Sequence, residues 1–324
     1  MTGRVVAFGG GHGLAASLRA LRHCQGELPL DITAVVTVGD DGGSSGRLRS
    51  ERGALPPGDL RQALVALADP HPVTRRSAEL FQHRFAPGGV GGPADDPLAG
   101  HAVGNLVLLG LIELLGDAVT ALDHAGQMLG VSGRVLPMSC EPVWIEADVR
   151  GADPNRPDET LTVYGQHAVA ITPGRVESVR LTPPSPPACR PAVDAVRSAD
   201  WLIFGPGSWY TSVIPHLLVP ELAEAIVTSS ARRLVMLNLA VETETLGLSA
   251  ADHLAALRWY LPELKVDAVL ADDRAVGDPN PVARAAESLG ARLVLAPVAV
   301  ADGAPRHDSA ALGAALVPLL GSAR

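Results

Sequence analysis

The sequence predicts an α/β fold in which a mostly parallel sheet carries helices on both faces. Strand-like runs such as Arg4–Phe8 and Ile32–Val38 are continuously apolar, as strands buried on both faces are. Segments with helical spacing of leucine and alanine, such as Leu14–Leu21, separate these runs. Alternating buried strands and helices are typical of a doubly wound domain.

The second half of the chain repeats the alternation, so we expect a single domain covering residues 1–324. The predicted strands there are Trp201–Phe204, Leu234–Asn238, Val266–Leu270 and Leu293–Leu295. The predicted helices lie around Tyr210–Leu218, Glu221–Ser229, Ala250–Tyr260 and Pro281–Leu289.

The first half contains three further helical segments and one loop rich in glycine and proline. The helices are predicted to begin near Asp59 and to cover about Val73–Phe85 and His101–Leu115. The segment Ala86–Pro97 between the last two is the best candidate for a mobile loop.

Between the two halves the pattern changes to short segments separated by Gly, Asp and Pro, which predicts a small β-rich insertion at about 135–181. Its expected strands are Val143–Val149, Leu161–Val163, His167–Ile171 and Val176–Leu181. We interpret Pro183–Pro191 as a stiff linker.

The composition excludes several functional classes. A net charge of −9 argues against a general nucleic-acid or anionic-membrane surface. Lys265 is the single lysine, so neither a Walker-type phosphate lysine nor a Schiff-base lysine stands near a glycine-rich loop. The three cysteines form no C-x-x-C pair, which argues against a zinc site or a disulfide framework. We expect a cytoplasmic protein without a membrane span, because the most apolar helix, Ala102–Leu115, is shorter than the roughly 20 residues a bilayer requires.

The most informative segment follows the second strand. From Val38 to Arg49 it contains two aspartates, four glycines, two serines and arginine. Glycines expose backbone N–H groups, carboxylates can hold a cation, and arginine supplies a fixed positive charge. This combination favours a phosphorylated ligand.

Two other glycine-rich loops also follow strands. Gly9–Gly13 precedes a helix as a dinucleotide-binding turn does, although Leu14 replaces the last glycine of the G-x-G-x-x-G fingerprint. Gly205–Ser208 precedes another helix, and Ser208 is predicted to cap an N-terminus that favours anions. Three such loops at strand ends predict one composite site.

Charged and polar side chains near these loops leave alternatives open. Asp40 could accept hydrogen bonds from a ribose, and one of Asp40 and Asp41 could hold a metal or pair with Arg47, since adjacent side chains of an extended chain point apart. At least one arginine of a cluster at positions 47, 49, 52 and 61 is expected to reach a phosphate.

Asp59 is predicted to be a helix N-cap that also contacts the ligand. His101 and Asn105, four residues apart, are either a buried pair or ligand contacts. The predicted nucleotide-binding residues are Gly10, Gly11, His12, Gly13, Asp40, Ser44, Ser45, Arg47, Asp59, His101, Asn105, Gly205, Gly207 and Ser208, and the predicted metal ligand is Asp41.

The sequence resembles the gluconeogenesis factor (YvcK) family, within the CofD-like 2-phospho-lactate transferase superfamily. The blocks that carry the resemblance are Gly10–Leu14, Thr37–Arg49, Leu55–Leu67, Gly100–Leu106, Gly205–Val219 and Leu246–His253. The resemblance implies a Rossmann-like fold, a nucleotide-sugar ligand such as UDP-N-acetylglucosamine, and a part in cell shape and cell-wall precursor supply during gluconeogenic growth. In one place the chain departs from the family: Leu239–Thr245 follows Asn238 where a Gln-Pro-Gly-Glu-Thr-like run is usual.

Three functional hypotheses follow from these observations. The favoured one is a regulatory factor that binds a UDP-sugar, with Mg²⁺ accompanying the nucleotide, and acts through protein partners in cell-wall synthesis, as a monomer or homodimer. The second is a transferase of a phosphoryl-linked group, for which the sequence offers no evident nucleophile–base pair. The third, a nicotinamide-dependent oxidoreductase, is weakest because the fingerprint is broken.

Overall fold

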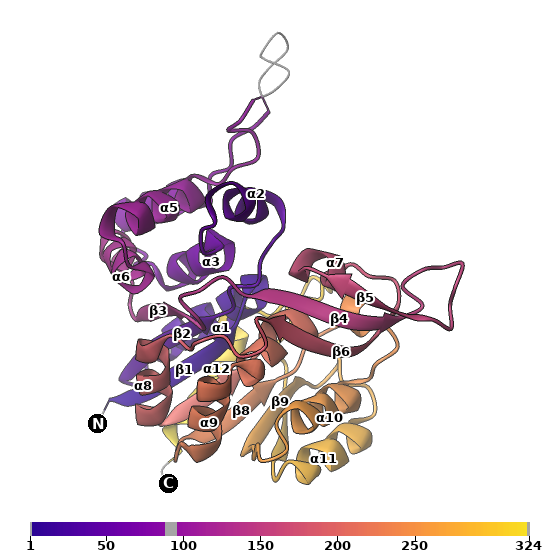
Figure 1. Cartoon of the computed structure of the whole chain (residues 1–324). Helices are drawn as coiled ribbons and strands as arrows, with labels where there is room; N and C mark the ends of the chain where they lie inside the picture. The colour runs from indigo at the N-terminus through magenta and orange to yellow at the C-terminus, as the bar shows by residue number, and fades with distance from the viewer. Residues whose placement is uncertain (1, 88–95, 323–324) are drawn as a thin grey trace.

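A computed structural model describes residues 2–87 and 96–322 and confirms the Rossmann-like α/β class (Figure 1). Seven strands form one sheet in the order β10-β9-β8-β7-β1-β2-β3. All six strand pairings in this sheet are parallel. The strands are β1 (Gly3–Gly9), β2 (Leu30–Val36), β3 (Arg134–Pro137), β7 (Trp201–Phe204), β8 (Arg232–Met236), β9 (Ala268–Asp272) and β10 (Arg292–Ala296).

Helices cover both faces of the sheet, and Figure 1 shows α8 and α9 in front of it and α12 behind. The last helix packs on the first, and α3 also packs on α1. The helices are α1 (Gly11–Cys24), α2 (Gly43–Arg52), α3 (Pro57–Leu67), α4 (Pro72–Gln82), α5 (Val103–Leu115), α6 (Ala118–Met128), α7 (Gln166–Ala170), α8 (Arg190–Ser198), α9 (Pro220–Thr228), α10 (Ala250–Tyr260), α11 (Pro279–Ser288) and α12 (Ser309–Gly321). None of the helices within the described ranges has the length and apolarity to cross a membrane.

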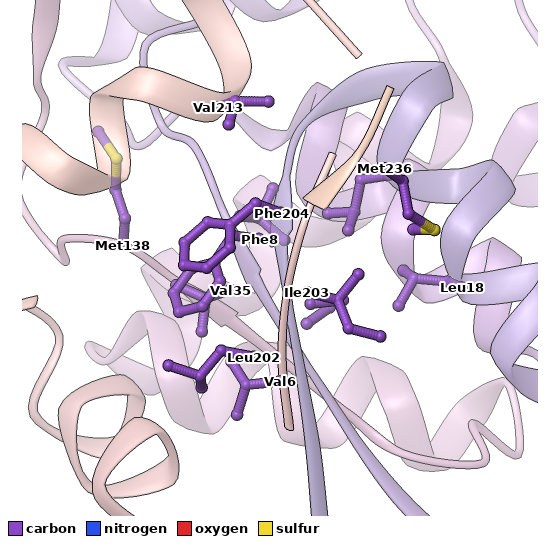
Figure 2. Close-up of a cluster of buried hydrophobic side chains, with 14 of the residues drawn as sticks. Val6, Phe8, Leu18, Val35, Met138, Leu202, Ile203, Phe204, Val213 and Met236 are labelled. Atoms are coloured by element: carbon purple, nitrogen blue, oxygen red, sulfur yellow. The ribbon is translucent and has the colours of Figure 1, made fainter. Parts of the chain in front are cut away.

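The core is centred on the two middle strands, β1 and β7. Phe8 of β1 stacks on Phe204 of β7 with ring centroids 4.9 Å apart, and both side chains are fully buried (Figure 2). Because these strands lie inside the sheet, their residues are covered on both sides, which explains their continuous apolar sequence. Burial of each such side chain contributes about 1.5–3 kcal/mol to folding.

The strand order reverses between β1 and β7. From β1 the chain proceeds to β2 and β3 on one side, whereas from β7 it proceeds to β8, β9 and β10 on the other. The loops that follow β1 and β7 therefore lie at the carboxyl edge of the sheet, at the point where its two halves diverge. Ligands of open α/β sheets bind at such a switch point.

The insertion is a three-stranded antiparallel sheet in the order β5-β4-β6, which projects beside the main sheet in Figure 1. Its strands are β4 (Trp144–Arg150), β5 (Thr160–Tyr164) and β6 (Arg175–Thr182). The residues at 134–137, at the start of the predicted insertion, instead form edge strand β3 of the main sheet.

One predicted strand of the insertion is wrong: His167–Ile171 overlaps helix α7. Gly165, at φ +94°, ends β5, and the N–H of His167 donates to the carboxylate of Asp41 at 2.8 Å. The side-chain amide of Gln166 donates to the carbonyl of Thr211. These anchors turn the chain away from the sheet, and such tertiary contacts leave no periodic signal in the sequence.

Several other segments differ from expectation. The predicted loop at 39–58 contains helix α2, the predicted linker leads directly into α8 at Arg190, and helices α6 and α12 were not predicted. The predicted helix at 210–218 is a π-turn, η1 (Trp209–Val213), followed by a 3₁₀ turn, η2 (Ile214–Leu218). The predicted mobile loop at 86–97 lies largely outside the described residues.

Candidate functional site

The loops after β1 and β7 pack backbone against backbone at the switch point. A Cβ added at Gly13 would overlap with the carbonyl oxygen of Pro206 and lie 2.5 Å from the Cα of Gly207. Gly13 is therefore required by close approach, whereas Gly207 has a φ of +135°, a conformation that favours glycine. The first and third glycine-rich loops do form one unit at the carboxyl edge of the sheet.

Two polar side chains fix the backbone of the third loop by hydrogen bonds. Asn238, which follows β8, accepts a hydrogen bond from the N–H of Gly207 at 2.8 Å and donates to its carbonyl at 3.0 Å. Ser17 of α1 donates to the carbonyl of Gly205 at 2.9 Å. The N–H of Gly207 thus already has a protein partner, and the φ of +135° at this position is what favours glycine.

The turn that follows Ser208 already carries a carboxylate of the protein. Glu244, in the short 3₁₀ turn η3 (Thr243–Thr245), accepts hydrogen bonds from the N–H of Tyr210 and the hydroxyl of Thr211, both at 2.8 Å. Burial raises the pKa of Glu244 to about 7. The prediction that Ser208 offers a helix N-terminus to an anion is therefore corrected: η1 has five residues, and Glu244 occupies its first donors. This carboxylate comes from residues 239–245, the segment in which the sequence departs from that of the family it resembles.

In the second loop, Asp40 and Asp41 point in different directions, as predicted for an extended chain. Asp41 accepts the hydrogen bond from α7, whereas Asp40 accepts from the N–H of Gly42 at 3.0 Å and faces α3. A Cβ at Gly58 would lie 2.7 Å from the Asp40 carboxylate. Asp41 as a metal ligand stays a prediction; residues 2–87 and 96–322 contain no group of three or more His, Cys, Asp or Glu side chains placed to hold a metal.

The four arginines of the predicted cluster separate in the structure. Arg49 is buried, donates to the carbonyls of Gly39 and Val143, and lies 3.6 Å from the centre of the Trp144 ring. Arg52 is exposed beside Glu113.

The other two arginines remain near the loops. Arg47 donates to the carbonyl of Ala99 at 2.6 Å. Arg61 is buried and donates to the side-chain oxygen of Asn105 at 3.1 Å, while its Nε has no hydrogen-bond partner within the described residues.

Ser44 joins the second loop to α5. Its hydroxyl lies 3.0 Å from Nδ1 of His101 and accepts a hydrogen bond from the side-chain amide of Asn105 at 3.0 Å. The same amide lies 3.5 Å from the hydroxyl of Ser45. His101 precedes α5 instead of lying in it, so the predicted His–Asn pair is bridged by Ser44. Burial, with the positive charge of Arg47, lowers the pKa of His101.

Asp59 is the most perturbed carboxyl group of the site. It is the third residue of α3, whose N-cap is Pro56, so the N-cap prediction is wrong. Its side chain accepts a hydrogen bond from the hydroxyl of Thr37 at 3.3 Å and lies directly beneath Gly10, where a Cβ would overlap with it. Burial and the nearby Asp40 raise the pKa of Asp59 to about 7. A group that titrates near neutrality beside the switch point of a sheet is characteristic of functional sites.

The predicted site residues thus form two groups of neighbouring residues, and one side chain lies apart from both groups. Gly10, Gly13, Asp59, Gly205 and Gly207 surround the contact of the first and third loops, and Gly11 begins α1. Asp40, Ser44, Ser45, His101 and Asn105 form the second group, with Arg47 beside Gly100. His12 is exposed on the first turn of α1.

Sequence comparisons assign this arrangement to a family. The family model described as 2-phospho-L-lactate transferase CofD matches residues 5–294. A Mycobacterium tuberculosis (strain H37Rv) protein named "Putative gluconeogenesis factor" is 50% identical over 320 residues, covering 98% of this chain and 90% of that protein. The chain belongs to the CofD family, among its gluconeogenesis factors.

Further relatives agree with this assignment. The Bacillus subtilis (strain 168) protein named "Gluconeogenesis factor" is 38% identical over 292 residues, covering 90% of this chain and 84% of that protein. A crystal structure of a Bacillus halodurans protein, described as a member of the upf0052 family, superposes with a TM-score of 0.82 at 34% identity. It covers 98% of this chain and 99% of that one.

A cavity of about 490 Å³ lies at the opposite edge of the sheet. It is lined by Asp31 and Arg134, at the amino ends of β2 and β3, and by residues of α6 including Asp123. Arg134 donates two hydrogen bonds to Asp123, at 2.9 and 2.7 Å. None of the predicted site residues lines this cavity, and ligands of parallel sheets bind at the carboxyl ends of strands, so we place the site at the glycine-rich loops.

Thr37, Asn238 and Glu244 help to form the site but were not predicted from the sequence. Thr37 and Asn238 are polar residues within two positions of the end of a buried strand, which is a signal for the carboxyl edge of a sheet. Glu244 gave no such signal, because its partners Tyr210 and Thr211 are far away in the sequence.

Replacement of Asp59 should change how stability depends on pH. The pKa of Asp59 is about 7 in the folded protein and ordinarily 3.8, so its favourable contribution is complete below pH 4 and is lost as the pH rises through 7. Relative to the wild type, Asp59→Asn should gain on the order of a few kcal/mol in the free energy of unfolding between pH 4 and pH 8. Denaturant titrations at both pH values would measure this, with the exposed Asp31→Asn as control. Equal pH profiles of Asp59→Asn and wild type would contradict the account.

Gly13→Ala should separate the first and third loops. The added methyl group cannot fit against Pro206 and Gly207, so we expect a loss of about 1–3 kcal/mol in the free energy of unfolding, typical of overpacking. Gly110→Ala is a matched control, because a Cβ there meets open space on a helix. Chemical denaturation of both variants tests the contact, and a Gly13→Ala protein as stable as Gly110→Ala would rule it out.

Proposed function

We propose that the chain binds a nucleotide sugar of the UDP-N-acetylglucosamine type at the switch point, and that this binding serves regulation. The observation that carries the proposal is the meeting of the β1 and β7 loops at Gly13 and Gly207, in the same loop as Gly10, which lies against the buried Asp59. A diphosphate needs a glycine-lined backbone surface that it can approach closely, and the glycines of these two loops would supply one.

The second loop would bind the other parts of the ligand. Asp40, beside the start of α3, would accept hydrogen bonds from ribose hydroxyls, and the network around Ser44 and Asn105 offers neutral hydrogen-bonding groups for a sugar. Arg47 and the unpartnered Nε of Arg61 are the nearest positive groups for phosphate oxygens. Carboxylates of Asp40 and Asp41 are suitable oxygen ligands for a Mg²⁺ ion that neutralises the diphosphate.

The regulatory role is supported by the relatives that are named gluconeogenesis factors. We propose that this chain likewise acts in gluconeogenic growth, and that nucleotide-sugar binding adjusts cell shape and cell-wall precursor supply through protein partners in the cytoplasm. A sensor of this kind needs only different ligand affinities in two conformations. The insertion contacts the second loop through α7 and Asp41, so it is the element that can report occupancy.

One observation favours a second candidate function, a transferase of a phosphoryl-linked group. The matching family model is described as a 2-phospho-L-lactate transferase, and Asp59 has a pKa of about 7, which suits a general base at neutral pH. In a transferase, Asp59 would accept a proton from an attacking hydroxyl group beside Gly10.

A thermal-shift titration with UDP-sugars, UDP, GDP and NAD tests the binding proposal. Ligand at one hundred times its dissociation constant should raise stability by about 2.7 kcal/mol. Arg47→Ala should weaken the binding of the effective ligand by roughly 1.5–3 kcal/mol, the range for a charge-assisted hydrogen bond. Arg52→Ala is the control, because this exposed arginine on the same helix contacts Glu113. The proposal fails if none of these nucleotides shifts the melting temperature at millimolar concentration.

Incubation with UDP-N-acetylglucosamine and Mg²⁺ separates the regulatory function from the transferase. We expect the nucleotide sugar to remain intact by chromatography, since binding alone requires no turnover. Steady release of UDP or UMP that is lost in Asp59→Asn, while that variant still binds the nucleotide, would favour the transferase instead.

A further inference from the structure

Two of the three cysteines stand where the chain enters and leaves the insertion. Cys140 follows β3, and Cys189 is the N-cap of α8. The antiparallel sheet β4-β5-β6 and helix α7 lie between them in the sequence. These two positions therefore form the base of the insertion.

The structure brings the two cysteines together. The N–H of Cys189 donates to the carbonyl of Met138 at 3.0 Å, which aligns the start of α8 with the end of β3. This bond places Cys189 beside the chain that leads from Met138 to Cys140, and the two thiols are close enough for each to shift the pKa of the other. Cys140 is exposed, whereas Cys189 is buried. Cys24 lies elsewhere, buried beneath α12, with its thiol 3.4 Å from the carbonyl oxygen of Gly313.

The surroundings give the two thiols different reactivities. The Cys189 thiol lowers the pKa of Cys140, against the opposing charges of Asp117 and Glu141. The Cys140 thiol and burial raise the pKa of Cys189, while Arg134 acts in the opposite direction. An exposed thiol with a lowered pKa beside a protected second thiol is the arrangement of a reactive and a resolving cysteine.

We propose that Cys140 and Cys189 are a reversible oxidation site for hydroperoxides that links the two ends of the insertion. The Cys140 thiolate attacks the terminal peroxide oxygen, the O–O bond breaks, and a sulfenic acid forms while hydroxide leaves from hydrogen peroxide or an alkoxide leaves from an organic hydroperoxide, each then taking up a proton. The Cys189 thiol then attacks the sulfenic sulfur, an S–S bond forms, the S–O bond breaks, and water leaves. The two thiols together lose two electrons and two protons, and the hydroperoxide is reduced to water or an alcohol.

The proposal is independent of any nucleotide, and thiol counting on the full chain tests it. The reduced protein is treated with hydrogen peroxide, denatured, and alkylated with iodoacetamide. Before oxidation three cysteines should be alkylated, and afterwards only one, because the sequence contains three cysteines in total. Peptide mapping should place the link between Cys140 and Cys189, and dithiothreitol should restore three alkylated thiols.

Two serine variants serve as controls. Cys140→Ser changes an exposed side chain and should keep both remaining thiols alkylatable after peroxide. Cys189→Ser places a preferred residue at the N-cap of α8, so folding should be retained, and Cys140 should then persist as a sulfenic acid that dimedone traps. The proposal would be overturned if the peroxide-treated wild type kept three alkylatable thiols. A disulfide that involves Cys24, or one that joins two separate molecules, would overturn it as well.

Discussion

The contact between Gly13 and Gly207 is the constraint on which the site depends. The loop after β1 and the loop after β7 belong to halves of the sheet that extend in opposite directions, and they can touch because Gly13 carries no side chain. Asn238 and Ser17 then hold the third loop at this distance by hydrogen bonds to the backbone of Gly207 and Gly205. The junction of the two loops is thus made of packed backbone, which keeps its geometry better than flexible side chains would.

Burial of ionisable groups around this contact gives the protein two opposing pH dependences. The pKa values of Asp59 and Glu244 are raised to about 7, so both favour the folded state less as the pH rises through that range. Burial lowers the pKa values of His216 and His253 to about 4, so these two destabilise the folded state below their ordinary pKa of 6.5, and stability increases as the pH rises from 4 to 6.5. Between pH 4 and 6.5 the carboxyl groups lower the stability of the fold as the pH rises, whereas the histidines raise it. The two contributions partly cancel in the wild type, and single substitutions should reveal each of them.

The fold and the position of the site follow from local patterns, whereas the connections within the site do not. Apolar runs such as Ile32–Val38 identify buried strands, and glycines directly after them locate the carboxyl edge, so the convergence of the loops was predictable. The partners of Ser44, Arg49 and Glu244 come from residues distant in the sequence, and a single sequence gives no signal for such pairs. The same reason explains why α7 was mistaken for a strand: its position depends on Asp41, which precedes it by 126 residues.

Helix α12 adds a requirement of another kind. It lies against α1, where Gly313 approaches so closely that a Cβ would lie 2.8 Å from the Cβ of His23. The sequence separation of the Cys24–Gly313 hydrogen bond is 289 residues, so the part of the α1 surface that α12 covers stays exposed until α12 has been synthesised. Contacts between such distant segments slow folding, because the entropy lost in closing a long loop must be overcome before packing contributes favourable free energy. During synthesis on the ribosome, β1 and α1 would therefore keep apolar surface exposed until almost the whole chain has been made.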